Sequence, residues 1–112
     1  MGKSDVKDPL KVADRMRALC SRREYCSKDV LKKVMTALDG DAAKAEEVVG
    51  KLVEERYVDD RRYAAAFARD KASIAGWGAA KIRYMLAAKG VDREIIASAL
   101  EEIDVNRADA RL

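Results

Sequence analysis

The sequence predicts an all-α protein of tandem three-helix repeats, arranged as an elongated curved array. Two observations predict this fold. Apolar residues recur at helical spacing along 112 residues that contain one proline and six glycines. The pattern also repeats, because an ungapped shift of 51 residues places Asp41 on Asp92 and matches apolar residues with apolar residues. The predicted organisation is a disordered or tag-like tail at 1–8, complete repeats at 9–58 and 59–104, and the start of a truncated third repeat at 105–112.

The first repeat has a start signal for each of its three helices. Asp8 is a good N-cap residue, and Pro9 is favoured at the first helical position. Ser27 is expected to cap the second helix, and Gly40 is expected to end it in the left-handed conformation. Asp41 is expected to cap the third helix. The residues expected to face the core recur three and four residues apart: Val12, Met16, Leu19, Cys20, Leu31, Val34, Met35, Leu38, Ala45, Val48, Val49, Leu52 and Val53.

The second repeat starts near Asp59 or Asp60 and has helix start and stop signals at matching positions. Gly78 is expected to cap its second helix, Gly90 to follow the end of that helix, and Asp92 to cap the third. Trp77 precedes a cap and is expected to pack inward as a hydrophobic staple, which is a structural role. The predicted core residues are Tyr63, Ala66, Phe67, Ile82, Met85, Leu86, Ile95, Ile96, Ala99, Leu100 and Ile103.

Composition excludes several classes of function. The sequence has no histidine, which removes Ser-His and Cys-His catalysis and most zinc sites. Cys20 and Cys26 fit neither a disulfide framework nor a metal-ligand spacing. The longest uncharged run, 72–80, is far shorter than the roughly 20 residues of a membrane span, and no apolar stretch follows Met1. We therefore expect a soluble, cytoplasmic protein that is not an enzyme and has no cofactor, metal, membrane partner or small-molecule substrate.

Charge is segregated along the chain and alternates with the repeats. Residues 11–33 carry eight basic and three acidic residues, whereas residues 39–60 carry three basic and eight acidic ones. Residues 61–91 carry seven basic residues against Asp70 alone, and residues 92–104 carry one basic and five acidic residues. If the units stack in register, the basic helices of both would line one side. Lys32 and Arg83 are 51 residues apart and are therefore expected to project alike.

Four ordered stretches of the sequence form the pattern of a known family. Residues 22–27 read RREYCS, followed by Leu31 and Met35, and residues 55–64 read ERYVDDRRYA. Phe67 to Lys71 is followed by Gly76-Trp77-Gly78 and then by Lys81-Ile82. Leu86, Lys89-Gly90-Val91 and Ala99-Leu100 complete the pattern. These runs resemble the RREYS start, the GYLDDxRFA junction, the F-x-R-x-K…G-x-G-P-x-R-I middle and the L-x-x-K-G-V…AL ending of the RecX family, over roughly residues 12–104.

Three departures from the family pattern bear on the prediction. Ala79 stands where the family often has proline, so the start of that helix is less rigidly fixed. The first repeat reads Leu38-Asp39-Gly40 and lacks the Lys-Gly ending. Family members usually carry three tandem units, whereas this sequence holds two and the start of a third. A binding surface on a third unit would therefore be missing.

The resemblance implies a non-enzymatic regulator of the RecA recombinase. Such proteins bind in the groove of the RecA filament on single-stranded DNA and restrain ATP hydrolysis and strand exchange, in DNA recombination, DNA repair and the SOS response. A basic side would suit DNA phosphates, and acidic third helices would suit basic protein surface. The residues alone also fit two alternatives, a stand-alone sequence-independent DNA-binding module and a helical protein-interaction scaffold.

The candidate contact residues are the basic residues of the first two helices in each repeat. Their charge suits both phosphates and acidic protein surface, so either RecA or the DNA could be their partner. They are Arg61, Arg62, Arg69, Lys71, Lys81 and Arg83 in the second repeat and Arg22, Arg23, Lys28 and Lys32 in the first. No catalytic and no metal-binding residue is predicted.

Overall fold

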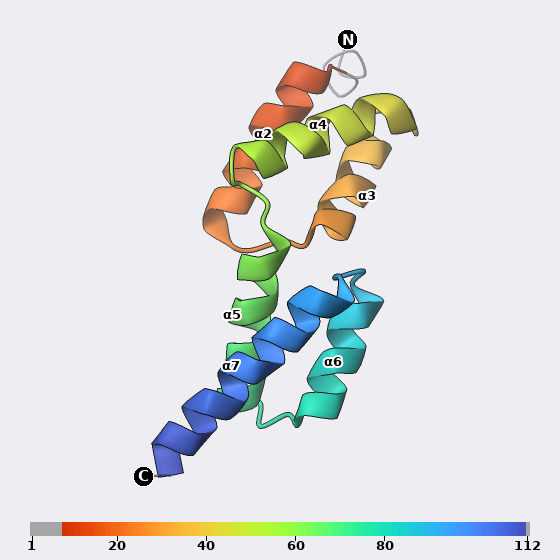
Figure 1. The fold of residues 1–112 in the computed structure, drawn as a ribbon. Helices are drawn as coiled ribbons and strands as arrows, with labels where there is room; N and C mark the ends of the chain where they lie inside the picture. The colour runs from red at the N-terminus through yellow and green to blue at the C-terminus, as the bar shows by residue number, and fades with distance from the viewer. Residues whose placement is uncertain (1–7, 112) are drawn as a thin grey trace. The chain divides into compact units, whose positions relative to one another are not determined.

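The regular elements of the chain are helices throughout the part that the structure describes (Figure 1). The computed structural model describes residues 8–111, with side chains for residues 8–103, and these contain no strand. The all-α prediction is therefore confirmed. Of the predicted tail, only Asp8 lies within the described residues. The helices are α2 (Pro9–Arg22), α3 (Ser27–Ala37), α4 (Ala42–Glu54), α5 (Asp60–Ser73), α6 (Ala79–Ala88) and α7 (Arg93–Arg111).

Two compact units divide the chain between Asp59 and Asp60. Each unit contains three helices, as tandem three-helix repeats require. In each, the third helix packs on the other two: α4 contacts α2 and α3, and α7 contacts α5 and α6 (Figure 1). Residues 105–111, predicted to start a third repeat, continue α7 without a break. The third helix therefore closes the core of each unit.

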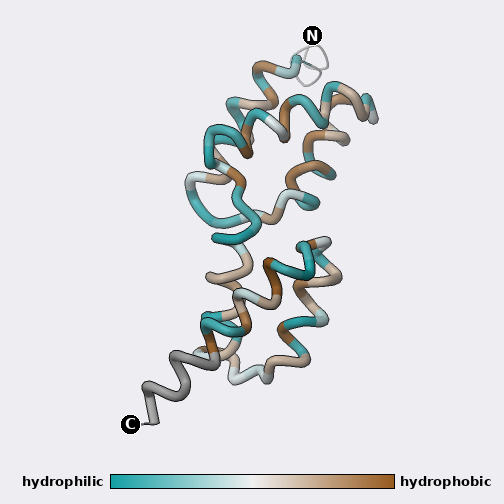
Figure 2. The backbone as a smooth tube through the Cα atoms, in the orientation of Figure 1, coloured by the Kyte–Doolittle hydropathy of each residue, from teal (hydrophilic) through white to brown (hydrophobic). Residues whose placement is uncertain are grey.

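The core of the first unit is apolar, and hydrophobic residues alternate with hydrophilic ones along its helices (Figure 2). In α4, the spacing of three and four residues predicted Ala45, Val48 and Leu52, and all three are buried. Val53 was predicted to be buried with them, but it is 47% exposed, because it follows Leu52 by about 100° around the helix. The buried members are Val12, Ala13, Met16, Val30, Val34, Leu38, Ala45, Val48, Leu52 and Val58.

The second unit has its own core and shares no residue with the first. Its first helix contributes only alanines to the fully buried set, Ala64 and Ala68, so α5 approaches its neighbours closely. Ala66, which was predicted to be buried, is only partly covered. The buried members are Ala64, Ala68, Ile82, Leu86, Val91, Ile96, Ala99, Leu100 and Ile103.

The second helices of the two units are offset by 52 residues, one more than the predicted shift of 51. The cap of α3 is Cys26, not Ser27 as predicted, and its carbonyl accepts from the Val30 N–H at 3.1 Å. Gly78 caps α6 as predicted, so α3 begins one residue earlier in the repeat. Ile82 is fully buried in α6, and its counterpart in α3 is Val30, 52 residues earlier.

This offset corrects the predicted equivalence of Lys32 and Arg83. Lys32 lies two residues after the buried Val30, whereas Arg83 lies one residue after the buried Ile82. At about 100° per residue, their directions relative to the core differ by roughly a quarter turn. The two side chains therefore do not project alike. Lys32 occupies the place that Tyr84, not Arg83, occupies in the second unit.

The left-handed residue that ends α3 is Asp39, with Gly40 after it. Gly40 was predicted for that role, but Asp39 already has φ 56° and Gly40 then has φ 81°. The Gly40 N–H donates to the Met35 carbonyl at 2.7 Å, which completes a Schellman motif. In the second unit, Gly90 takes the equivalent position with φ 79°. The first unit thus places a side chain where the second has none.

Replacing Asp39 with glycine is expected to stabilise the first unit. A side chain in the left-handed region is strained, and glycine removes that strain at some entropic cost, so we expect a gain of about 0.5–1 kcal/mol. Urea unfolding followed by far-UV circular dichroism measures it. Asp39→Ala is the matched control and should destabilise, because alanine tolerates the left-handed region less well than aspartate. A loss of stability in Asp39→Gly would contradict the assignment.

An ion pair joins α2 to the end of α4. The Arg17 guanidinium donates to both carboxylate oxygens of Glu55, through Nε at 2.8 Å and Nη2 at 3.1 Å, and to Asp14 at 2.7 Å. These hydrogen bonds, and then the charge of Arg17, hold the pKa of Glu55 below its ordinary value of 4.5. Hydrogen bonding to Glu55 likewise raises the pKa of Arg17. The pair therefore favours the folded state whenever Glu55 is ionised.

Glu55→Gln is expected to lower the melting temperature slightly at neutral pH. Because the folded-state pKa of Glu55 is depressed, its stabilisation is fully present above its ordinary value of 4.5 and disappears as the pH falls through the folded-state value. The difference in melting temperature between wild type and Glu55→Gln should therefore shrink in acid. The control is Glu54→Gln, one residue earlier and exposed. A difference that grows in acid would contradict this sign.

Candidate functional site

Three aromatic rings and two lysines form a cluster on the second unit, here called the aromatic–lysine cluster. Tyr63, Phe67 and Lys71 come from α5, Trp77 from the α5–α6 loop, and Lys81 from α6. The α5 members are four residues apart, and such residues are neighbours along one side of a helix. The three rings are half-buried and pack against the second core.

The rings form a continuous chain of contacts. The Tyr63 and Phe67 centroids are 5.9 Å apart with the planes 29° apart, which is a stacked arrangement. The Phe67 and Trp77 centroids are 6.1 Å apart with the planes at 69°, which is an edge-on contact. Both separations lie within the range in which aromatic pairs attract. The rings therefore tie the loop to α5.

The loop geometry fixes where Trp77 lies. The Trp77 N–H donates to the Lys71 carbonyl at 2.8 Å, so the chain folds back on the end of α5. Gly76 has φ 73°, a conformation that glycine adopts without strain. Gly78 then starts α6 as its N-cap. Trp77 is therefore held between the end of one helix and the start of the next.

The two lysines converge on the Trp77 ring from different helices. The Lys81 Nζ is 4.2 Å from the centroid, and the Lys71 Nζ is 5.0 Å from it and 5.5 Å from that of Phe67. Each such contact is worth about 0.5–1 kcal/mol at an exposed site. The rings thus hold two ammonium groups in place without neutralising them. Such groups can bind phosphate or carboxylate.

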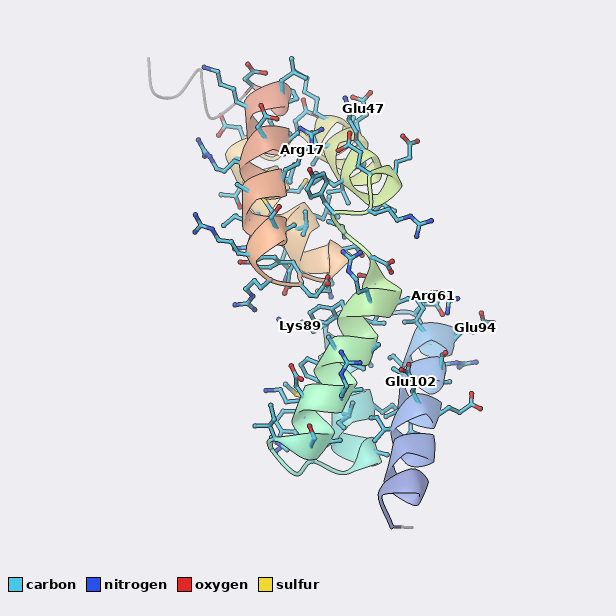
Figure 3. All side chains as sticks on the ribbon, turned by 90° about the vertical axis from the view of Figure 1, so that its left-hand side faces the viewer. Arg17, Glu47, Arg61, Lys89, Glu94 and Glu102 are labelled. Carbon is cyan, nitrogen blue, oxygen red and sulfur yellow. The ribbon has the colours of Figure 1, made fainter. Side chains whose placement is uncertain are left out.

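The remaining predicted residues of the second unit lie on other sides of their helices. Arg62 and Arg69 are seven residues apart and share one side of α5, while Lys71, nine residues from Arg62, lies on the opposite side. On α6, Lys81 and Arg83 flank the buried Ile82 on either side. Arg61 lies in the first turn of α5 (Figure 3). The structure therefore brings Lys71 and Lys81 together and separates them from the arginines.

The predicted residues of the first unit also fall into two groups. Lys28 and Lys32 line a groove of about 610 Å³ between α3 and α4, together with Leu31 and Met35, and Glu46 lies on its α4 side. Arg22 and Arg23 lie at the end of α2. The Arg23 guanidinium is 4.8 Å from the Tyr25 ring, and the Lys33 Nζ is 5.7 Å from the same ring. Lys33 was not among the predicted residues.

Sequence reasoning missed the role of the aromatic residues. It gave Trp77 a packing role, which its burial against the core supports, but the ring also positions two of the predicted lysines. It passed over Tyr84, which is 72% exposed on α6. The exposure of Tyr84 could have been predicted, because Tyr84 lies two residues from both Ile82 and Leu86 and so falls outside the predicted apolar stripe.

Two classes of site receive no support from the residues that the structure describes. No three His, Cys, Asp or Glu side chains in that part of the chain lie close enough together to hold a metal ion. No helix there combines the length and the apolar character that crossing a membrane requires.

Comparisons with known proteins agree with one another. Residues 59–100 match the model of "RecX, second three-helix domain". The chain is 38% identical over 94 residues to "Regulatory protein RecX" of Thermus thermophilus, an alignment covering 84% of this chain and 63% of that protein. It is also 38% identical over 87 residues to "Regulatory protein RecX" of Xanthomonas axonopodis pv. citri, covering 77% of this chain and 52% of that protein.

A solved structure shares the fold. It is described as "Crystal structure of regulatory protein RecX" and superposes with a TM-score of 0.77 at 26% sequence identity. The similarity covers 91% of this chain and 49% of that chain. The chain thus spans between about half and two thirds of the length of the relatives that it matches.

Proposed function

Because the chain belongs to the RecX family of regulatory proteins, we propose that it regulates the RecA recombinase. In this proposal it acts in the cytoplasm, binds the RecA filament on single-stranded DNA, and inhibits ATP hydrolysis and strand exchange without catalysing a reaction itself. The observation that carries the proposal is the match of residues 59–100 to the second RecX domain. That stretch contains the whole aromatic–lysine cluster.

The charge of each helix supports two kinds of contact. α6 contains Lys81 and Arg83 and no acidic residue. Within the side chains described, neither residue forms an ion pair, so both can neutralise an anion. We assign Lys81, Arg83 and Lys71 as contacts to DNA phosphates. Binding is favoured because cationic side chains release the counterions that are condensed on the phosphates. The basic residues of the first unit, Arg22, Arg23, Lys28 and Lys32, are proposed contacts on the same grounds.

The acidic third helices support contact with protein. Glu47 on α4 and Glu94 and Glu102 on α7 are exposed (Figure 3). A protein–DNA filament presents basic protein surface beside anionic phosphate. A ligand with segregated charge can meet both, and opposite charges steer the two partners into register.

The proposal is tested by adding the purified chain to RecA, single-stranded DNA and ATP. We expect ATP hydrolysis to fall as the chain approaches stoichiometry with RecA, and strand exchange to fall with it. Unchanged hydrolysis at stoichiometric excess would contradict the proposal. DNA binding without any effect on RecA would instead favour a stand-alone DNA-binding module.

A further inference from the structure

Tyr84 is the one aromatic residue of the chain that packs on neither core. The other five, Tyr25, Tyr57, Tyr63, Phe67 and Trp77, are half-buried against the first or the second core. Tyr84 is 72% exposed, and no ring contact or hydrogen bond holds it to any of the side chains described. Its apolar surface therefore contributes little to folding and is available to a partner.

The surroundings of Tyr84 leave the ring accessible. Its neighbours three and four residues away on α6 are Ala80, Lys81, Ala87 and Ala88. Three of these side chains are single methyl groups, so among these four neighbours Lys81 alone is long enough to cover the ring. The Lys81 ammonium is turned toward Trp77, 4.2 Å from that ring. A flat group can therefore approach the Tyr84 ring closely.

The charge around Tyr84 is of one sign. Ile82 and Leu86 define the buried side of α6, and Tyr84, about 200° from Ile82, lies on the outer side. Lys81 and Arg83 flank it on its two sides, and α6 has no acidic residue. An exposed ring between two cations matches a strand that alternates flat bases with phosphates. An acidic protein surface could pair with the two cations, but it would offer no flat group to stack on the exposed ring.

We infer that Tyr84 is a base-stacking residue for single-stranded DNA and that Lys81 and Arg83 bind the phosphates on either side of the stacked base. The inference rests on the proposed function for the identity of the strand and deepens it, because it assigns the outer face of α6 to DNA and not to RecA. Lys81 joins this face to the aromatic–lysine cluster, so the strand would continue from Tyr84 toward Trp77. In a duplex, the bases stack on one another and their faces are closed to the ring.

The experiment compares the full chain with Tyr84→Ala and Tyr84→Phe in binding a fluorescein-labelled oligothymidylate at low salt, measured by fluorescence anisotropy. A mixed-sequence duplex serves as the second probe. Since one stacked base contributes a factor of about 5 to 140 in affinity, Tyr84→Ala should bind the single strand more weakly by that factor. Its duplex affinity should not change. Tyr84→Phe, which keeps the ring, should bind both probes like wild type.

The outcomes separate this inference from the proposed function. Equal affinity of wild type and Tyr84→Ala for the single strand would overturn the inference, and so would an equal loss on both probes. If Tyr84→Ala binds the single strand normally but no longer inhibits RecA, the tyrosine contacts protein and only the inference fails. If single-strand binding depends on Tyr84 while wild type leaves RecA unaffected, the inference stands and the proposed function fails. Circular dichroism should show no loss of helicity in Tyr84→Ala, because alanine is a better helix former than tyrosine.

Discussion

Reversing Lys71 and Lys81 to glutamate should raise the concentration of chain that half-inhibits RecA ATP hydrolysis by about tenfold or more. The two ammonium groups lie within 4.2–5.0 Å of one indole ring, so they present their charge at one place. Under the proposed function, reversal removes two phosphate contacts and places two carboxylates beside the strand. The measurement is a titration of RecA and single-stranded DNA with wild type and with the double variant.

The salt dependence of binding tests whether the lost contacts are phosphate contacts. Each contact on a single strand contributes about 0.7 to the slope of log affinity against log salt, so the slope should become less steep by about 1.4. An anisotropy titration at several salt concentrations gives this slope directly. An unchanged slope would mean that the lysines do not meet phosphate.

A matched control keeps the change in net charge but moves it to another helix. Lys44 and Lys51 are exposed on α4, and reversing both alters the net charge by the same amount. We expect Lys44→Glu/Lys51→Glu to inhibit RecA nearly as wild type does. An equal loss in both double variants would show that overall charge, and not the cluster, governs binding.

The neutral variant Lys71→Gln/Lys81→Gln separates binding from folding. Both charge-reversed and neutral variants lose the cation–π contacts to Trp77, so both lose the same small part of the stability. Only the reversed variant adds repulsion toward phosphate. We therefore expect the neutral variant to fall between wild type and the reversed one in inhibition, with all three equally helical. Trp77 is the only tryptophan, and its fluorescence reports the state of the cluster in each.

Sequence alone could predict the helices and most of their caps, because these depend on local signals. The Asp8 carboxylate accepts from the Leu10 N–H and that of Asp41 from the Lys44 N–H, as their positions predicted. The register of α3 could not be predicted in the same way. Val30-Leu31 and Val34-Met35 are pairs of adjacent apolar residues, and either member of each pair fits a four-residue spacing.

Packing against α4 decides between the members of those pairs. Val30 and Val34 are fully buried, whereas Leu31 and Met35 line the groove beside Lys28 and Lys32. The end of α3 depends in the same way on tertiary context. A glycine was available at position 40, yet the left-handed turn begins at Asp39, directly after the buried Leu38. Local propensity therefore predicted the left-handed turn one residue away from where it begins.

The candidate site could be predicted in its charges but not in its grouping. Charge counting identified Lys71 and Lys81 along with four arginines of the same repeat. What unites the two lysines is the Trp77 ring, and its position depends on the turn at Gly76 and the hydrogen bond back to Lys71. Those are properties of the folded loop. The separation of Arg83 from Lys81 likewise follows from which residue of α6 is buried.

The largest effects on stability are expected from truncating the two cores, one at a time. Leu52 and Ile82 are fully buried, each in its own core, and share no neighbour in the buried sets. Leu52→Ala and Ile82→Ala should each destabilise its unit by about 2–5 kcal/mol, from lost burial and the cavity left behind. For small units of marginal stability, a loss of this size approaches the whole free energy of unfolding.

Matched controls use exposed apolar residues close by in the sequence. Val53 is 47% exposed beside Leu52, and Ile74 is 82% exposed after α5. Val53→Ala and Ile74→Ala should change stability by no more than about 0.5 kcal/mol, because their side chains already contact water. A large effect of Val53→Ala would contradict its exposure in the structure and support the core position that the spacing predicted.

The location of Trp77 allows the two units to be followed separately. Urea unfolding monitored by Trp77 fluorescence reports the second unit, while far-UV circular dichroism reports both. Because the cores are distinct, Ile82→Ala should shift the fluorescence transition, whereas Leu52→Ala should shift only part of the dichroism transition. A fluorescence shift of equal size in Leu52→Ala would show that the units unfold together, and the two cores would then behave as one cooperative structure.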